Sequence, residues 1–202
     1  MSFSDTFKMP VGVRSYFNIP YAPEVSATCR LDIFIPEGDR AMLLPAFVSI
    51  HGGHWKSGSK ESQWALCSQL ALEGWVAVAV DYRLSGEAPF PAAVTDLRHA
   101  IRFLREHSSE IGINRSCIIA EGHSAGGHLA SLLGVLPERV VWDDDDAYYG
   151  VSSRCQGVVS IAGLKRNQIL FLKHNNQSSK PWVKYVKNSK QIELGFMLLI
   201  LM

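Results

Sequence analysis

The sequence has 202 residues, of which 47% are hydrophobic and 19% charged. This length allows one domain with a sizeable core but not two ordinary ones, and this composition excludes an intrinsically disordered chain. The formal net charge of +1 hides an asymmetry, because residues 165–202 hold seven Lys/Arg and a single acidic residue, Glu193. The rest of the chain is therefore mildly acidic and its end is basic.

The first half of the chain predicts strands and one helix. Residues 1–28 show little periodicity, and we assign no element to them. Residues 29–35 alternate as a half-buried strand does, with Asp32 on the polar face, and residues 46–50 form a short apolar strand. Residues 61–73 read as a helix that Gly74 ends, and residues 75–80 form an apolar run typical of a central strand.

The second half continues the alternation of helices and strands. A helix of about 16 residues is expected after Pro91, with its arginines and Glu106 largely in solvent. A strand at 117–120, a helix that ends near Leu136, a polar loop at 137–154 and a buried strand at 157–162 follow. This order predicts an α/β fold with a mostly parallel sheet and helices on both faces. The solvated arginines expected on the helix are Arg98, Arg102 and Arg105.

The strand at 117–120 runs into a pattern of residues that carries chemistry. It reads Gly122-His123-Ser124-Ala125-Gly126 and leads directly into a helix. A serine on a tight strand-to-helix turn is the arrangement of a nucleophile elbow, in which the flanking glycines avoid side-chain clashes. The turn also places the first amides of the helix beside the serine, where negative charge is favoured. We therefore expect Ser124 to be a nucleophile, with Gly122 and Gly126 as structural support.

A second loop offers the backbone donors that such a nucleophile needs. His51-Gly52-Gly53 follows the strand at 46–50, which is the arrangement of loops that bind the oxyanion of a tetrahedral intermediate. The predicted oxyanion donors are the N–H groups of Gly52, Gly53 and Ala125. His51 is expected to support this loop.

Four segments together resemble a known family. They are HGGHWKSGSK at 51–60, DYRL at 81–84, FPAAVTDL at 90–97 and GHSAGGHLA at 122–130. In this order they resemble the α/β-hydrolase esterases and lipases related to hormone-sensitive lipase, and above all the branch of feruloyl- and acetyl-esterase-like (BD-FAE) proteins. Kynurenine formamidases are similar in the first and last segments. The resemblance covers roughly residues 29–164 and implies Ser124 as nucleophile, with His123 typical of these two branches.

The end of the chain departs from this family. Family members carry a catalytic acid and then a histidine after later strands, but beyond residue 162 this chain has no Asp, and His174 precedes its one acid, Glu193. The acidic run at 143–146 comes too early and is expected to be a solvated loop. We therefore interpret residues 1–164 as the N-terminal part of an α/β-hydrolase domain. Residues 165–202 are interpreted as a divergent, poorly ordered basic tail, from a truncated or alternatively read chain end, without the later strands of the sheet.

The remaining candidates favour no metal and no cofactor. His51, His54, His123 and His128 lack the spacing of a metal site. Trp55, beside the oxyanion loop, and His123 are candidates for contact with the substrate. The four cysteines are widely spaced and are expected to be reduced, which favours the cytoplasm, and the N-terminus has no apolar stretch of the signal-peptide kind. Neither a membrane span nor a nucleic-acid partner is expected.

Three functions stay open at this point. The first is a serine hydrolase of small carboxylic esters. The second is an arylformamidase that uses the same serine. The third is a catalytically incomplete relative that lacks the triad acid and base, since loss of triad members leaves only residual catalysis.

Overall fold

The computed structural model describes residues 7–38, 42–138, 140, 148 and 150–162, and the backbone of residues 168–173 and 182–186. Its elements in chain order are β1 (Val13–Pro20), β2 (Arg30–Pro36), β3 (Leu44–Ile50), the short 3₁₀ helix η2 (Lys60–Gln63), α1 (Trp64–Leu72), β4 (Val76–Val80), α2 (Ala92–Glu106), α3 (Ser108–Ile111), β5 (Ile113–His123), α4 (Ala125–Val135), β6 (Gly157–Ala162), β7 (Gln168–Lys173) and β8 (Trp182–Val186).

The strands form one sheet in the order β1-β2-β4-β3-β5-β6-β7-β8. The four central strands β4, β3, β5 and β6 are parallel to one another. The strands on either side of this set pair antiparallel. The predicted α/β class, with its mostly parallel centre, is confirmed.

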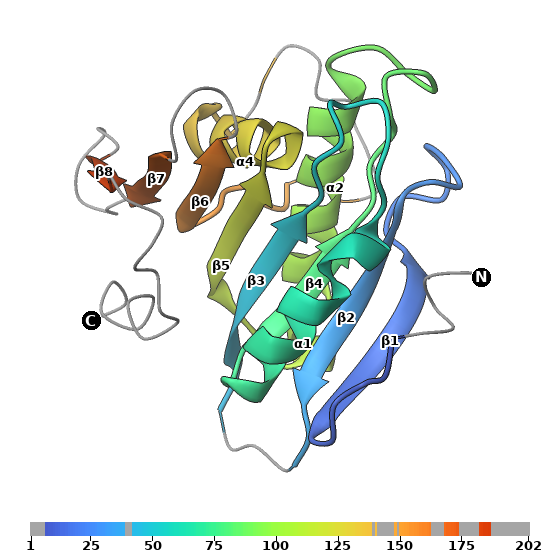
Figure 1. Ribbon diagram of the computed structural model, residues 1–202, viewed down its shortest axis with the longest axis vertical. Helices are drawn as coiled ribbons and strands as arrows, with labels where there is room; N and C mark the ends of the chain where they lie inside the picture. Colours follow the sequence, from blue (N-terminus) through green and yellow to red (C-terminus); the bar gives the residue numbers. More distant parts are fainter. Residues whose placement is uncertain are drawn as a thin grey trace.

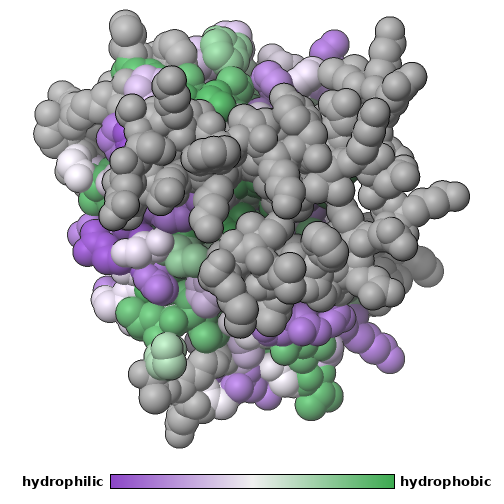
Figure 2. Space-filling model, turned by 90° about the vertical axis from the view of Figure 1, so that its left-hand side faces the viewer, coloured by the Kyte–Doolittle hydropathy of each residue, from purple (hydrophilic) through white to green (hydrophobic). Residues whose placement is uncertain are grey.

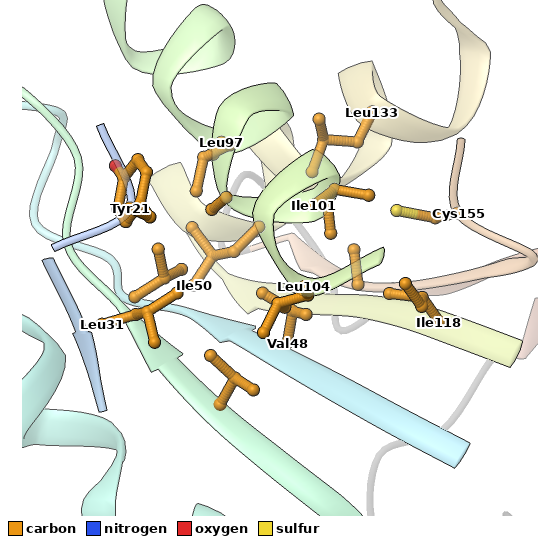
Figure 3. Packing of buried hydrophobic residues seen from close by; sticks show 14 of the residues in the cluster. Tyr21, Leu31, Val48, Ile50, Leu97, Ile101, Leu104, Ile118, Leu133 and Cys155 are labelled. Atoms are coloured by element: carbon orange, nitrogen blue, oxygen red, sulfur yellow. The ribbon is translucent and has the colours of Figure 1, made fainter. Parts of the chain in front are cut away.

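Helices cover both faces of the sheet, with α1 in front of it and α2 and α4 behind in Figure 1. Side chains of β3 alternate between two hydrophobic clusters. Val48 and Ile50 pack with Leu97 and Ile101 of α2, as Figure 3 shows, whereas Phe47 packs on the α1 side. A strand that is buried on both faces carries an uninterrupted apolar run, and for this reason β3 and β4 could be predicted from the sequence.

The strand β1 was missed by the sequence analysis. It pairs antiparallel with β2, but its register shifts between Tyr16 and Ile19, and Asn18 has a positive φ of 58°. A bulge of this kind interrupts the two-residue period on which strand prediction depends. The other predicted strands and helices are confirmed, with β5 longer than expected.

The expectation that the arginines of α2 lie in solvent is wrong. Arg98, Arg102 and Arg105 are only 2%, 6% and 5% exposed. The Arg98 guanidinium donates to the carbonyls of Pro137 and Glu138, and Arg105 donates to several carbonyls. The segment after α4 therefore covers this side of α2, and its backbone carbonyls satisfy the buried charges.

The sequence predicts that the later strands of the sheet are missing, which would leave β6 as an edge strand. In the structure β6 is not an edge strand. β7 pairs with it antiparallel from Gly157 to Ala162, and β8 pairs with β7. Neither strand extends the parallel set, which ends at β6 among the described residues. Most of residues 165–202 lies outside the described part of the chain, so the poor order expected for this tail stays a prediction.

Three further observations concern the surface and the cysteines. On the side that carries β6 to β8, hydrophobic and hydrophilic residues lie side by side in the described surface (Figure 2). In the described part of the chain no helix combines the length and the hydrophobicity that a bilayer crossing requires. All four cysteines are free thiols, and only Cys117 is not fully buried.

Candidate active site

Two loops leave neighbouring parallel strands and meet at one edge of the sheet. Ile50 lies opposite Gly122 in the pairing of β3 with β5. The loop that begins at His51 and the turn at Ser124 therefore emerge side by side. The chain steps from β3 to β4 in one direction and from β4 back past β3 to β5 in the other, and open α/β sheets bind ligands at such a reversal.

Ser124 occupies a strained turn between β5 and α4. Its φ of 56° and ψ of −118° are a combination that residues with a side chain rarely adopt. Its N–H donates to the carbonyl of Ile161 at 2.8 Å, while its side chain makes no capping hydrogen bond to α4. A serine at a helix N-terminus ordinarily caps the helix. The half-buried Ser124 hydroxyl is therefore not engaged in capping α4.

Close backbone contacts hold this turn against β3. A Cβ atom on Gly122 would lie 2.8 Å from the Gly127 nitrogen and would overlap Gly126. A Cβ atom on Gly126 would lie 2.7 Å from the His51 carbonyl oxygen and would overlap that of Ile50. Real Cβ atoms do not approach backbone so closely, so both positions require glycine.

Gly52 lies directly against the serine turn. A Cβ atom on Gly52 would be 2.9 Å from the His123 carbonyl oxygen and 3.5 Å from the Ser124 Cβ. Gly53 has a φ of 120°, and a Cβ atom there would overlap the Ser57 carbonyl. Oxyanion donors must reach a substrate oxygen at about 3 Å while the nucleophile attacks the adjoining carbon. The approach of Gly52 to Ser124 is compatible with that requirement.

The His51 side chain packs beneath its own loop. Its ring is 1% exposed, stacks on Tyr82 with the ring centres 4.4 Å apart, and donates from Nδ1 to the Gly52 carbonyl at 2.8 Å. The Tyr82 hydroxyl donates to the His51 carbonyl at 3.0 Å. Burial lowers the pKa of His51, which keeps the ring neutral. These contacts tie the start of the loop to the end of β4.

A buried lysine anchors the far end of the same loop. Lys60 is 2% exposed, and its Nζ lies 2.8 Å from the Glu61 carboxylate and 3.2 Å from that of Asp32. Its backbone N–H donates to the Asp81 carboxylate at 2.7 Å. Burial opposes the charge, but the bonds to Glu61 and Asp32 raise the pKa of Lys60. Burial also raises the pKa of Asp81 to about 6, although the bond from Lys60 acts against it.

A buried carboxyl group lies three residues before Ser124. Glu121 is 5% exposed, and its carboxyl lies 2.8 Å from the Ser49 hydroxyl, which also lies 2.8 Å from Gln63 Oε1. A hydroxyl has one proton to donate, so a protonated Glu121 completes the chain by donating to Ser49. Burial raises the pKa of Glu121 to about 7, with the Ser49 bond lowering it in part.

This carboxyl makes stability depend on pH, and Glu121→Gln is expected to remove that dependence. Because the folded-state pKa lies above the ordinary 4.5, the native state holds the proton more tightly. Its stabilisation is complete below pH 4.5 and is lost as the pH rises toward about 7. The variant, whose amide can still donate to Ser49, should therefore be more stable than the native chain at pH 8 by about 1–3 kcal/mol.

Thermal unfolding at pH 5 and pH 8 measures the effect. Glu106→Gln, on the exposed end of α2, serves as the matched control and should leave the pH dependence unchanged. Equal pH dependence of the native chain and the Glu121→Gln variant would show that Glu121 ionises normally.

The two residues predicted to contact the substrate, Trp55 and His123, both lie at the surface. His123 is exposed, as is His128 of α4, and the ring of Trp55 meets that of His128 edge to face at 5.4 Å. Trp55 is 36% exposed and, like His54, has a positive φ. Trp55, in the loop after β3, therefore contacts α4, the helix that begins directly after Ser124.

The described residues do not supply a base for the serine. Across residues 7–38, 42–138 and 150–162, no histidine is hydrogen-bonded to the Ser124 hydroxyl, and no three metal-ligating side chains gather. His174, Glu193 and residues 143–146 lie outside the described residues. The expectations for them are therefore untested.

Sequence reasoning missed the buried charges behind the site. Asp32 was assigned to the polar face of its strand, yet it is 0% exposed and accepts the indole N–H of Trp64 at 2.7 Å. The partners Asp32 and Lys60 are 28 residues apart, and no local pattern joins them. Glu121 did carry a signal, because it is a charged residue within the apolar run that precedes Ser124.

Comparison with known protein families matches this chain to one family model. The model is that of the BD-FAE family, and it matches residues 31–195.

Curated relatives include esterases of Mycobacterium tuberculosis. The chain is 38% identical over 110 residues to the probable carboxylic ester hydrolase LipM, covering 54% of this chain and 26% of LipM. It is 35% identical over 98 residues to the carboxylesterase NlhH, covering 48% of this chain and 31% of NlhH. The matches span about a quarter of the length of relatives such as LipM.

Solved structures that resemble this chain include two with similar coverage of it. An esterase of the planctomycete Thermogutta terrifontis, Est2 with propionate bound, aligns with a TM-score of 0.60 and 30% identity over 75% of this chain and 54% of its own. A bifunctional GH43-CE protein of Bacteroides eggerthii aligns with a TM-score of 0.64 and 31% identity over 71% of this chain and 20% of its own.

Proposed function

Because this chain belongs to the BD-FAE family of α/β-hydrolase fold, we propose that it carries the nucleophile and the oxyanion hole of a carboxylic ester hydrolase. The single observation that carries the proposal is the contact between the Gly52 loop and the strained turn of Ser124. Relatives named as esterases and carboxylesterases support the substrate class.

The proposed reaction begins with attack of the Ser124 oxygen on the ester carbonyl carbon. The carbonyl π electrons move to the oxygen, and the N–H groups of Gly52, Gly53 and Ala125 stabilise the resulting oxyanion. Collapse of this intermediate expels the alcohol and leaves an acyl group on Ser124, which water then removes as a carboxylic acid. The proposal assigns no described residue as the base that takes the serine proton, because no described histidine is hydrogen-bonded to the Ser124 hydroxyl.

Trp55 and His123 are the substrate contacts that this proposal assigns. Both are exposed beside the serine turn, and Trp55 is held edge to face by His128. A flat indole face of this kind can pack against the acyl or alcohol group of an ester. The four free thiols support a reducing location such as the cytoplasm.

The test is hydrolysis of p-nitrophenyl acetate by the purified 202-residue chain and by its Ser124→Ala variant. We expect release of p-nitrophenol by the native chain and a rate at the uncatalysed background for the variant, since removal of the nucleophile leaves no acyl-enzyme route. Ser109→Ala, which changes an exposed serine far from the turn, should keep full activity. A native rate that equals that of Ser124→Ala would instead identify a catalytically incomplete relative.

An arylformamidase is the second candidate, because the same serine and donors could act on a formamide. Formanilide, offered to the same three proteins, separates the two. Faster Ser124-dependent release of aniline than of p-nitrophenol, each relative to its uncatalysed rate, would favour the formamidase.

A further inference from the structure

An open cavity of about 800 Å³ lies on the α1 side of the sheet, near its β1 edge. It is lined by the segment before β1, by β1 itself and by five residues near the start of α1, which are Gly58, Ser59, Glu61, Ser62 and Trp64. Ser124 and the other residues proposed for catalysis, Gly53 and Ala125 among them, are not part of its wall. Its volume is in the range of small-molecule sites, so it has room for a ligand of its own.

Three aromatic rings line this cavity. The rings of Phe7 and Phe17 lie 5.6 Å and 5.1 Å from that of Trp64, both tilted against it. Phe17 is 44% exposed although it is a large apolar side chain. Aromatic faces carry partial negative charge and attract cations, tryptophan most strongly. The Trp64 indole also donates to the Asp32 carboxylate at 2.7 Å, which fixes its ring beside a negative charge.

The charges around the cavity have an excess of carboxylates. Glu61 is part of its wall. Behind the wall, the Nζ of Lys60 lies 2.8 Å from Glu61, 3.2 Å from Asp32 and 4.0 Å from Asp81. Three carboxylates thus share one ammonium group. Although burial opposes it, the bond from Lys60 lowers the pKa of Glu61, so the carboxylate in the wall is ionised at neutral pH.

The wall itself contains no Lys, Arg or His among the described residues. A low-dielectric hollow with one sign of charge on its wall raises the local concentration of the opposite sign. The apolar rings favour a ligand with a hydrophobic body, and the carboxylates favour a positive charge on it.

We propose that this cavity binds an organic cation, an ammonium or quaternary ammonium group with an apolar body. The rings of Phe7, Phe17 and Trp64 contact the cation and Glu61 neutralises it. The site also adjoins the oxyanion loop, because a Cβ atom on Gly58, in the cavity wall, would lie 2.6 Å from the His51 ring. A bound cation therefore lies behind the loop that faces Ser124. The proposal does not depend on hydrolytic activity.

The experiment titrates the full chain with choline and with 3,3-dimethylbutan-1-ol, which has the same shape but no charge. Binding is measured by calorimetry and by the NMR signal of the Trp64 indole N–H. We expect saturable binding of choline with a Kd on the order of 1 mM, and binding of the neutral alcohol at least about tenfold weaker, since charge supplies the cation–π and carboxylate attraction.

Matched variants test the residues. Phe17→Leu and Glu61→Gln should each weaken choline about three- to tenfold, with unchanged thermal unfolding showing that the half-exposed positions are not needed for folding. Phe90→Leu and Glu73→Gln, which change an aromatic residue and an acid outside the cavity wall, should bind choline as the native chain does.

Equal affinity for the alcohol and choline would overturn the proposal in favour of a merely apolar cavity. Absence of saturable binding up to about 50 mM, or equal loss in the control variants, would overturn it as well.

Discussion

Gly126→Val is expected to leave little folded protein. A Cβ atom on residue 126 would overlap the Ile50 carbonyl oxygen and would lie 2.7 Å from the His51 carbonyl oxygen. These are backbone atoms of β3 and of the loop that follows it, in the centre of the sheet, and they cannot move as a flexible side chain can. A branched side chain therefore has to separate the turn from β3. Overpacking of a tight core costs about 1–3 kcal/mol, and a clash with two carbonyl groups should exceed that range.

The measurement is thermal or urea unfolding of the soluble fraction, with the yield of soluble protein recorded beside it. Gly86→Val is the matched control, because a Cβ atom on Gly86 meets no atom within 4 Å. It should unfold as the native chain does, within about 0.5 kcal/mol. A Gly126→Val variant that is soluble and as stable as Gly86→Val would refute the described approach of the serine turn to β3.

Lys60→Met is expected to destabilise the fold by about 3–5 kcal/mol at neutral pH, as loss of one member of a buried ion pair does. The ammonium group lies 3.2 Å from the Asp32 carboxylate, and the two side chains are 2% and 0% exposed. Methionine matches the length of the lysine stem but leaves the Asp32 carboxylate buried without its counter-charge. The backbone N–H of residue 60 can still donate to the Asp81 carboxylate in the variant, so the loss of stability reports on the side chain alone.

Urea unfolding at pH 8 measures this loss. Lys56→Met, an exposed lysine of the same loop, should change stability by less than about 0.5 kcal/mol. If Lys60→Met is no less stable than Lys56→Met at pH 8, the buried pair contributes nothing.

The importance of one of these two residues could be predicted from the sequence, and that of the other could not. Gly126 stands in a local pattern, two residues after Ser124 and at the start of a helix. Lys60 looks like any lysine in a polar loop, and only its burial against Asp32 makes it important.

Features of the protein that depend on neighbours along the chain could be predicted from the sequence alone. The apolar runs of β3 and β4, the turn at Ser124 and the glycines at 52 and 53 follow from periodicity and from backbone requirements that act within a few residues. These features were enough to predict the α/β class and the two loops of the candidate site.

Features that depend on partners far away in the sequence could be known only from the folded chain. Arg105 of α2 can be buried because carbonyls almost 50 residues away, such as that of Arg154, accept hydrogen bonds from its guanidinium. Asp32 can likewise be buried because the distant residues Trp64 and Lys60 bind its carboxylate. β7 pairs with β6 because β6 offers a free backbone edge, which the sequence of β7 does not reveal. Burial of a charge costs free energy unless a partner compensates the charge. The tertiary structure, and not the neighbouring residues in the sequence, determines which partner does so.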